Sequence, residues 1–85
     1  MRRPQTKPPT KEKAQQLFGF ALRGFREEQG VTQERLAELA DLHTTYVGSV
    51  ERGERNVSLN NITQLAYALK IPVSTLVACL DPGKL

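Results

Sequence analysis

Residues 32–53, TQERLAELADLHTTYVGSVERG, indicate two short helices joined by a tight turn. Apolar residues recur at helical spacing in both halves, and Gly53 marks the end of the second helix. That second helix begins almost without charge and offers the hydroxyls of Thr44, Thr45 and Ser49 on its expected outer face. The pattern predicts a helix-turn-helix, in which one helix lies against the DNA backbone and the next enters the major groove.

Further helices are expected on both sides of this motif. Before it, a helix should begin near Thr10 or Lys11, carry one apolar stripe from which Phe20 departs, and end at Gly30. After it, Ser58 should cap a fourth helix and Ser74 a short fifth one, which ends at Asp81-Pro82-Gly83. No strand pattern competes. The sequence therefore predicts an all-α fold, a compact bundle of five helices with the helix-turn-helix at its centre.

The apolar pattern also predicts which residues form the core. The faces expected to point inward on the second, third and fourth helices carry Leu36, Ala37, Leu39 and Ala40; Val47, Val50 and Glu51; and Leu59, Ile62, Leu65, Ala66 and Leu69.

Length and charge predict one domain with a basic arm. The chain has 85 residues, and residues 1–10 contain three prolines. We expect residues 1–10 to form a disordered arm, either a solvated tail or a segment that touches DNA phosphates or a minor groove, and residues 11–85 to form the domain. Residues 1–13 hold five basic and one acidic side chain, whereas the remainder holds seven basic and eight acidic ones. Net charge alone therefore does not indicate a nucleic-acid partner.

Other residue types give little sign of catalysis. Cys79 is the only cysteine, so no intramolecular disulfide can form, and a reducing, cytoplasmic setting is expected. Its thiol is interpreted as a small apolar group or, alternatively, as a redox-sensitive one. His43 has no neighbouring metal-ligand residue, and no nucleophile arrangement or phosphate-binding loop is present. We expect no enzyme activity, no metal or other cofactor, and no membrane span.

The run from Leu17 to Val77 resembles the Cro/C1-type (XRE) helix-turn-helix family, whose fold is the lambda-repressor-like DNA-binding domain. The resemblance is carried by Arg26, Thr32-Gln33, Leu36-Ala37, Val47, Val50-Glu51-Arg52-Gly53 and Ser58-Leu59. Within that family, the segment HTTYVGSVERGERNVSL is especially similar to the controller proteins of restriction–modification systems.

The resemblance implies a set of DNA contacts. Gln33 would hold a phosphate, and Thr44, Thr45 and Ser49 would face bases, with Tyr46 reaching a base or the backbone. Arg52, Arg55 and Asn56 would meet phosphates. Two residues depart from the family pattern: Asp41 stands where the turn usually has glycine, and Thr44 replaces a longer polar side chain. Aspartate tolerates a left-handed backbone, so the turn is expected to persist.

Glu51 is expected to need a partner. It follows Val47 by four residues and so points toward the inner side of its helix, where a carboxylate must be paired. Its partner could be Arg55, four residues further on, or Arg26 of the first helix. The resemblance implies the Arg26–Glu51 pair.

The C-terminal part carries more apolar residues than one small core is expected to hold, which predicts a two-fold homodimer. Its interface is expected to include Tyr67, Leu76, Val77 and Leu80. Such a dimer would bind double-stranded DNA at a near-palindromic operator and act as a transcription regulator. Two alternatives use the same fold: a helical protein–protein interaction module, and an antitoxin that binds both DNA and a protein.

Overall fold

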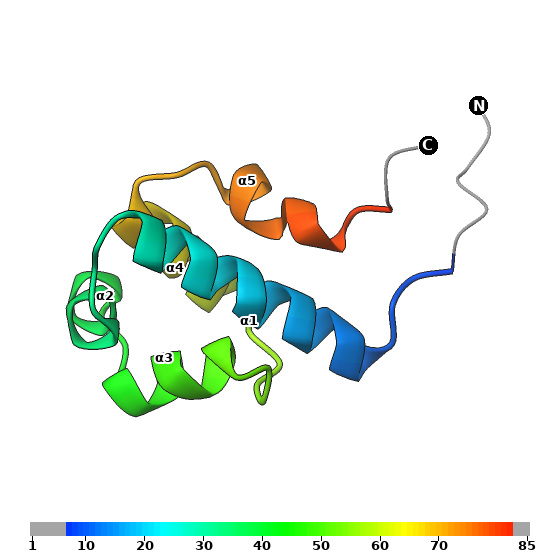
Figure 1. Cartoon of the computed structure of the whole chain (residues 1–85), viewed down its shortest axis with the longest axis horizontal. Helices are drawn as coiled ribbons and strands as arrows, with labels where there is room; N and C mark the ends of the chain where they lie inside the picture. Colours follow the sequence, from blue (N-terminus) through cyan, green and yellow to red (C-terminus); the bar gives the residue numbers. More distant parts are fainter. Residues whose placement is uncertain (1–6, 83–85) are drawn as a thin grey trace.

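The computed structural model describes residues 7–82, and within that range all regular secondary structure is helical (Figure 1). The elements are α1 (Lys11–Glu28), α2 (Gln33–Ala40), α3 (Thr44–Glu51), α4 (Leu59–Leu69) and α5 (Val73–Val77), followed by the 3₁₀ turn η1 (Ala78–Leu80). Figure 1 shows α1 crossing the middle of the molecule between α3 and α5, with α4 behind it. The predicted all-α five-helix bundle with a central helix-turn-helix is confirmed.

The predicted arm and the C-terminal end of the predicted domain both extend past the described residues. Residues 7–10 are exposed and have no regular secondary structure, whereas residues 1–6 of the expected arm lie outside the described part. Gly83 of the expected final turn also lies outside it.

Hydroxyl side chains fix the starts of three helices. Thr10, Thr32 and Ser58 each accept a hydrogen bond from the backbone N–H three residues later, at 3.0–3.1 Å. These bonds satisfy N–H groups that a helix leaves without an internal partner. The cap expected at Ser74 is wrong. Pro72 precedes α5 directly, and its carbonyl already accepts the first helical bonds, so Ser74 lies inside the first turn.

Left-handed residues end the first four helices. Gly30 and Gly53 adopt this conformation, and so do Asp41 (φ 59°) and Lys70 (φ 58°). The expectation that Asp41 would replace the usual glycine of the turn is confirmed. The backbone N–H of Leu42 then bonds back to the carbonyl of Ala37 at 2.9 Å, which closes the turn and directs the chain into α3.

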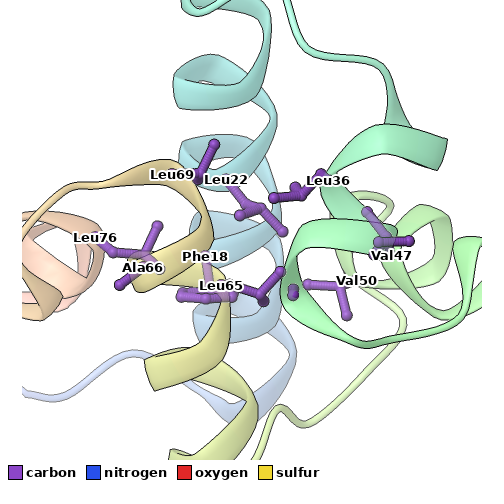
Figure 2. Close-up of a cluster of buried hydrophobic side chains, with 11 residues drawn as sticks. Phe18, Leu22, Leu36, Val47, Val50, Leu65, Ala66, Leu69 and Leu76 are labelled. Atoms are coloured by element: carbon purple, nitrogen blue, oxygen red, sulfur yellow. The ribbon is translucent and has the colours of Figure 1, made fainter.

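A single hydrophobic core joins all five helices. Phe18 and Leu22 of α1 lie at its centre, with α2 and α3 on one side and α4 and α5 on the other (Figure 2). The core residues are Phe18, Leu22, Leu36, Ala37, Ala40, Val47, Val50, Leu65, Ala66, Leu69 and Leu76.

Two leucines expected in this core are exposed. Leu39 retains 46% of its accessible surface because Leu36, Ala37 and Ala40 already fill the inward face of α2 and leave Leu39 at its edge. Leu59 retains 84% because it is the first residue of α4, where residues 58–60 are all exposed.

The C-terminal helices complete the core instead of leaving the expected apolar surplus outside it. Leu76 is fully buried within the helical bundle of the single chain, so its predicted place in a dimer interface is wrong. Of the other three residues assigned to that interface, Tyr67 is 75% exposed, and Val77 and Leu80 are half-buried.

Helices α1 and α3 approach closely at Gly19, a buried residue of α1. A β-carbon there would overlap the carbonyl oxygen of Val50 and would lie 2.7 Å from that of Glu51. Both are backbone atoms and cannot swing aside. Gly24, also within α1, is exposed and has nothing within 4 Å of the same position.

Replacing each of these glycines with alanine should have opposite effects on stability. Gly19→Ala should lower the free energy of unfolding by about 1–3 kcal/mol, because the helices must move apart. Gly24→Ala should raise it by up to about 1 kcal/mol, because alanine favours the helix and meets no neighbour. Urea denaturation followed by circular dichroism measures both, and an equal response would contradict the close approach.

Candidate DNA-binding surface

The first turn of α3 presents two hydroxyls to solvent. Thr44 and Thr45, the first two residues of the helix, are exposed, as is His43, which precedes them without making a side-chain cap bond. From Val47 to Val50 the helix is buried, so only its beginning can approach another molecule. The two hydroxyls therefore lie where the sequence placed base-facing groups, and they are short donors and acceptors of the kind that suits base edges.

Gly48 lets residues from the start of α2 and from the end of α3 lie over the middle of α3. A β-carbon on Gly48 would lie 3.3 Å from Nη1 of Arg52 and 3.5 Å from Oε1 of Gln33. These two side chains therefore cover the glycine, which is buried beneath them. The structure thus brings together two of the residues expected to hold phosphates.

Beneath this surface lies the ion pair expected from the sequence. Nε of Arg26 donates to Oε2 of Glu51 at 2.6 Å, and Nη2 donates to Oε1 at 3.0 Å. The side chains are 12% and 3% exposed. Arg26 also donates to the carbonyl of Val31 at 2.9 Å. The hydrogen bond with Glu51 is the main reason that the pKa of Arg26 is raised, while burial acts in the opposite direction. The open alternative, a pair between Glu51 and Arg55, does not form.

The same carboxylate orients Gln33. Nε2 of Gln33 donates to Oε1 of Glu51 at 2.9 Å, so the amide is tied to the ion pair while its residue opens α2. An amide nitrogen carries two hydrogens, which leaves the second available to an outside acceptor. The start of α2 adds unpaired backbone N–H groups, which favour a phosphate at this position.

Ser49 does not occupy the outer face expected for it. It is 4% exposed, its hydroxyl donates to the carbonyl of Tyr46 at 2.7 Å, and it accepts from Nε of Arg55 at 3.0 Å. The predicted contact of Ser49 with a base is therefore wrong. The turn at Gly53 folds the following loop back over this part of α3, and the arginine that the turn delivers covers the serine.

Arg55 and Tyr46 form a second polar cluster at the rim of the surface. The guanidinium carbon of Arg55 lies 5.7 Å from the centre of the Tyr46 ring, within reach of a cation–π interaction. The Tyr46 hydroxyl accepts from Nδ2 of Asn61 in α4 at 3.0 Å. Sequence reasoning missed Asn61, because nothing in the periodicity of α4 indicates that one polar side chain reaches back to α3.

Two of the expected phosphate ligands, Arg52 and Asn56, are exposed at the end of α3 and in the loop that follows it. Arg52 is paired with Glu54 through bonds of 3.0 and 3.2 Å, and both side chains are more than half exposed. The hydrogen bond raises the pKa of Arg52 and lowers that of Glu54. Asn56 is exposed and follows Arg55 directly.

Outside this surface the described residues show few reactive features. No group of three His, Cys, Asp or Glu side chains among residues 7–82 could hold a metal ion. Partial burial raises the pKa of the Cys79 thiol, which favours its neutral form and fits the interpretation as a small apolar group.

Within the same range no single helix is long and apolar enough to cross a membrane. The pair α4 and α5–η1 passes that test only when taken together, and the chain bends by 113° between its two halves.

The comparisons with known proteins agree with this geometry. A helix-turn-helix family model matches residues 22–76. Control protein C.SmaI of Serratia marcescens is 48% identical over 62 residues, which cover 73% of this chain and 74% of that protein. Control protein C.BamHI of Bacillus amyloliquefaciens is 46% identical over 56 residues, which cover 65% of this chain and 69% of that protein.

A solved structure shares both fold and sequence. The restriction-modification controller protein C.AhdI of Aeromonas hydrophila superposes with a TM-score of 0.74 at 50% identity. The match covers 75% of this chain and 97% of that one, so almost the entire relative lies within the aligned region.

Removing the charge of Glu51 should destabilise the protein strongly. Glu51→Gln leaves the shielded Arg26 guanidinium with only the half-exposed carboxylate of Glu27, 4.0 Å away, as a counter-charge. Breaking a buried pair costs about 3–5 kcal/mol. Glu54→Gln removes a charge from an exposed pair on the loop three residues later and should leave the unfolding midpoint nearly unchanged. Thermal denaturation of the two variants measures the difference, and equal small effects would show that Glu51 behaves as a surface charge.

Proposed function

The chain belongs to the Cro/C1-type (XRE) helix-turn-helix family, and we propose that it is the homodimeric controller of a restriction–modification system. Membership in the family makes it a DNA-binding transcription regulator, and not an enzyme. The controller assignment is supported by control and controller proteins at 46–50% identity. Residues 11–85 would form the DNA-binding domain and residues 1–10 its basic arm, and the regulator would act in the cytoplasm.

The observation that carries the proposal is the exposed first turn of α3 between two anchored polar groups. Thr44 and Thr45 would contact base edges in the major groove, because they are the exposed side chains of the first turn of α3 and carry short hydroxyls. Gln33 on one side and Arg55 on the other, each held by a bond to α3, would contact phosphates and set the depth of the helix.

Other residues would support these contacts from the rim. Arg52 would exchange Glu54 for a phosphate, and Asn56 would add a neutral donor beside it. Tyr46 would act through its ring, which lies against Arg55, and its hydroxyl is already engaged with Asn61. In this proposal the loop after α3 contributes mainly to affinity, and the first turn of α3 determines the preferred base sequence.

The homodimer would use the exposed side of the C-terminal helices. Tyr67 is the large apolar residue of α4 that is exposed near its C-terminal end, and Val77 and Leu80 are partly exposed on the following segment. Leu76 is excluded, because it belongs to the core. Two-fold symmetry would place the α3 helices about 34 Å apart, one turn of DNA, and the operator would be a near-palindrome with half-sites about ten base pairs apart.

Selection from random double-stranded DNA tests the regulator assignment. We expect one near-palindromic sequence, bound with an affinity that falls steeply as salt rises, because phosphate contacts release counterions. Thr45→Ala should alter preference at one base-pair position of each half-site by about 1–3 kcal/mol. Thr63→Ala, a hydroxyl deletion on the exposed side of α4, is the matched control and should change nothing. Recovery of no preferred sequence would favour the protein–protein interaction module instead.

Sedimentation equilibrium at micromolar concentration tests the dimer. Tyr67→Asp should raise the dissociation constant of the dimer at least tenfold, because it places a charge in an apolar interface. Leu59→Asp changes a residue on the same helix that is also largely exposed but lies at the opposite end, and it should leave the dimer intact. A wild-type monomer at these concentrations, or a dimer indifferent to Tyr67→Asp, would refute the proposed interface.

A further inference from the structure

Arg55 is held from two sides although it lies on an exposed loop. Its Nε donates to the hydroxyl of Ser49 at 3.0 Å, and its guanidinium carbon lies 5.7 Å from the centre of the Tyr46 ring. Among the described residues, no hydrogen bond engages its two outer nitrogens. The guanidinium is therefore anchored by its inner nitrogen, and its outer edge remains free for a planar, bidentate contact.

The anchor is well defined because Ser49 is buried and its hydroxyl both donates one hydrogen bond and accepts another. The residue is 4% exposed, and its single hydroxyl proton goes to the carbonyl of Tyr46 at 2.7 Å. A hydroxyl has one proton to donate, so Ser49 has none left for a base, while its lone pair receives Arg55.

The chain is built to deliver Arg55 to this anchor. After α3 the left-handed residue Gly53 reverses the backbone, and the N–H of Glu54 bonds to the carbonyl of Ser49 at 3.0 Å. The next residue is Arg55. Asn61 of α4 fixes the Tyr46 hydroxyl, so the ring beneath the guanidinium is held as well.

We propose that Ser49 is a positioning residue that sets the orientation of Arg55 for a DNA phosphate. The inference rests on the proposed DNA-binding function and deepens it. An arginine that is already oriented loses less side-chain freedom on binding, so more of its contact energy appears as affinity. Ser49 itself touches no DNA and contributes to affinity only while Arg55 is present.

A double-mutant cycle on the selected operator tests this dependence. We expect Ser49→Ala to weaken binding about five- to tenfold and Arg55→Ala to weaken it more. In the Arg55→Ala background, Ser49→Ala should have less than a twofold further effect, because its only route to DNA has been removed. Ser49→Ala retains the charge of Arg55 and should keep the salt dependence of binding, whereas Arg55→Ala should reduce its slope by about one.

Two further measurements separate positioning from folding and from base contact. Circular dichroism monitors whether each variant is folded, and Ser49→Thr, which retains a hydroxyl, should restore binding. In the free wild-type protein the Nε proton of Arg55 should exchange slowly with solvent in nuclear magnetic resonance spectra, a measurement that requires neither DNA nor a variant.

Several results would overturn the proposal. These are an equal loss from Ser49→Ala with and without Arg55, no loss at all, a changed preference at one base-pair position, or rapid exchange of the Nε proton. Failure of the wild-type protein to select any operator would instead refute the DNA-binding function, and the exchange measurement would still report whether Ser49 holds Arg55.

Discussion

The ion pair between Arg26 and Glu51 fixes the helices on which the groups that would face DNA are mounted. It joins α1 to α3, and through the Val31 carbonyl and the Gln33 amide it also holds the turn and the start of α2. A shielded charge pair is tolerated only when it is complete, so an alternative packing of these helices would strand one of the charges. Gly19 permits the short distance that the pair requires, because its missing side chain lets the backbones of α1 and α3 nearly touch.

This packing leaves little of α3 exposed. Within the segment from Val47 to Val50, the two valines belong to the core and Ser49 anchors the loop through Arg55, so the exposed part of the helix is its first turn. The arginines that would meet phosphates lie beside this first turn, and each is held by its own partner. The sequence beyond residue 13 carries one more acidic than basic side chain, so the body of the protein is nearly neutral. A nearly neutral body limits attraction to DNA of any sequence, which leaves the placement of a few groups to decide where the protein binds.

Features that depend on neighbouring residues could largely be predicted from the sequence, whereas the burial of particular side chains by distant segments could not. The caps at Thr10, Thr32 and Ser58 and the left-handed Asp41 follow from neighbouring residues and could be inferred directly, whereas the cap predicted at Ser74 failed because Pro72 already begins that helix. Periodicity gives the direction of a side chain but not what covers it. Periodicity therefore predicts that Ser49 faces DNA, although a turn four residues later brings Arg55 over it. The interface predicted for Leu76 fails for the same reason, since the pattern cannot distinguish an apolar residue that completes the core from one that is left outside it.

The small size of the exposed turn also explains why one copy would not suffice. A good base contact contributes about 1–3 kcal/mol of discrimination, and specific regulators exceed their non-specific binding by about 4–10 kcal/mol. Thr44 and Thr45 together can supply only the lower part of that range. Two copies related by symmetry double the free energy of base discrimination without enlarging the domain. Because the dimer must assemble first, binding to the operator then depends on protein concentration. We therefore connect the proposed homodimer to the burial of Val47 to Val50, which leaves only the first turn of α3 exposed for base contacts.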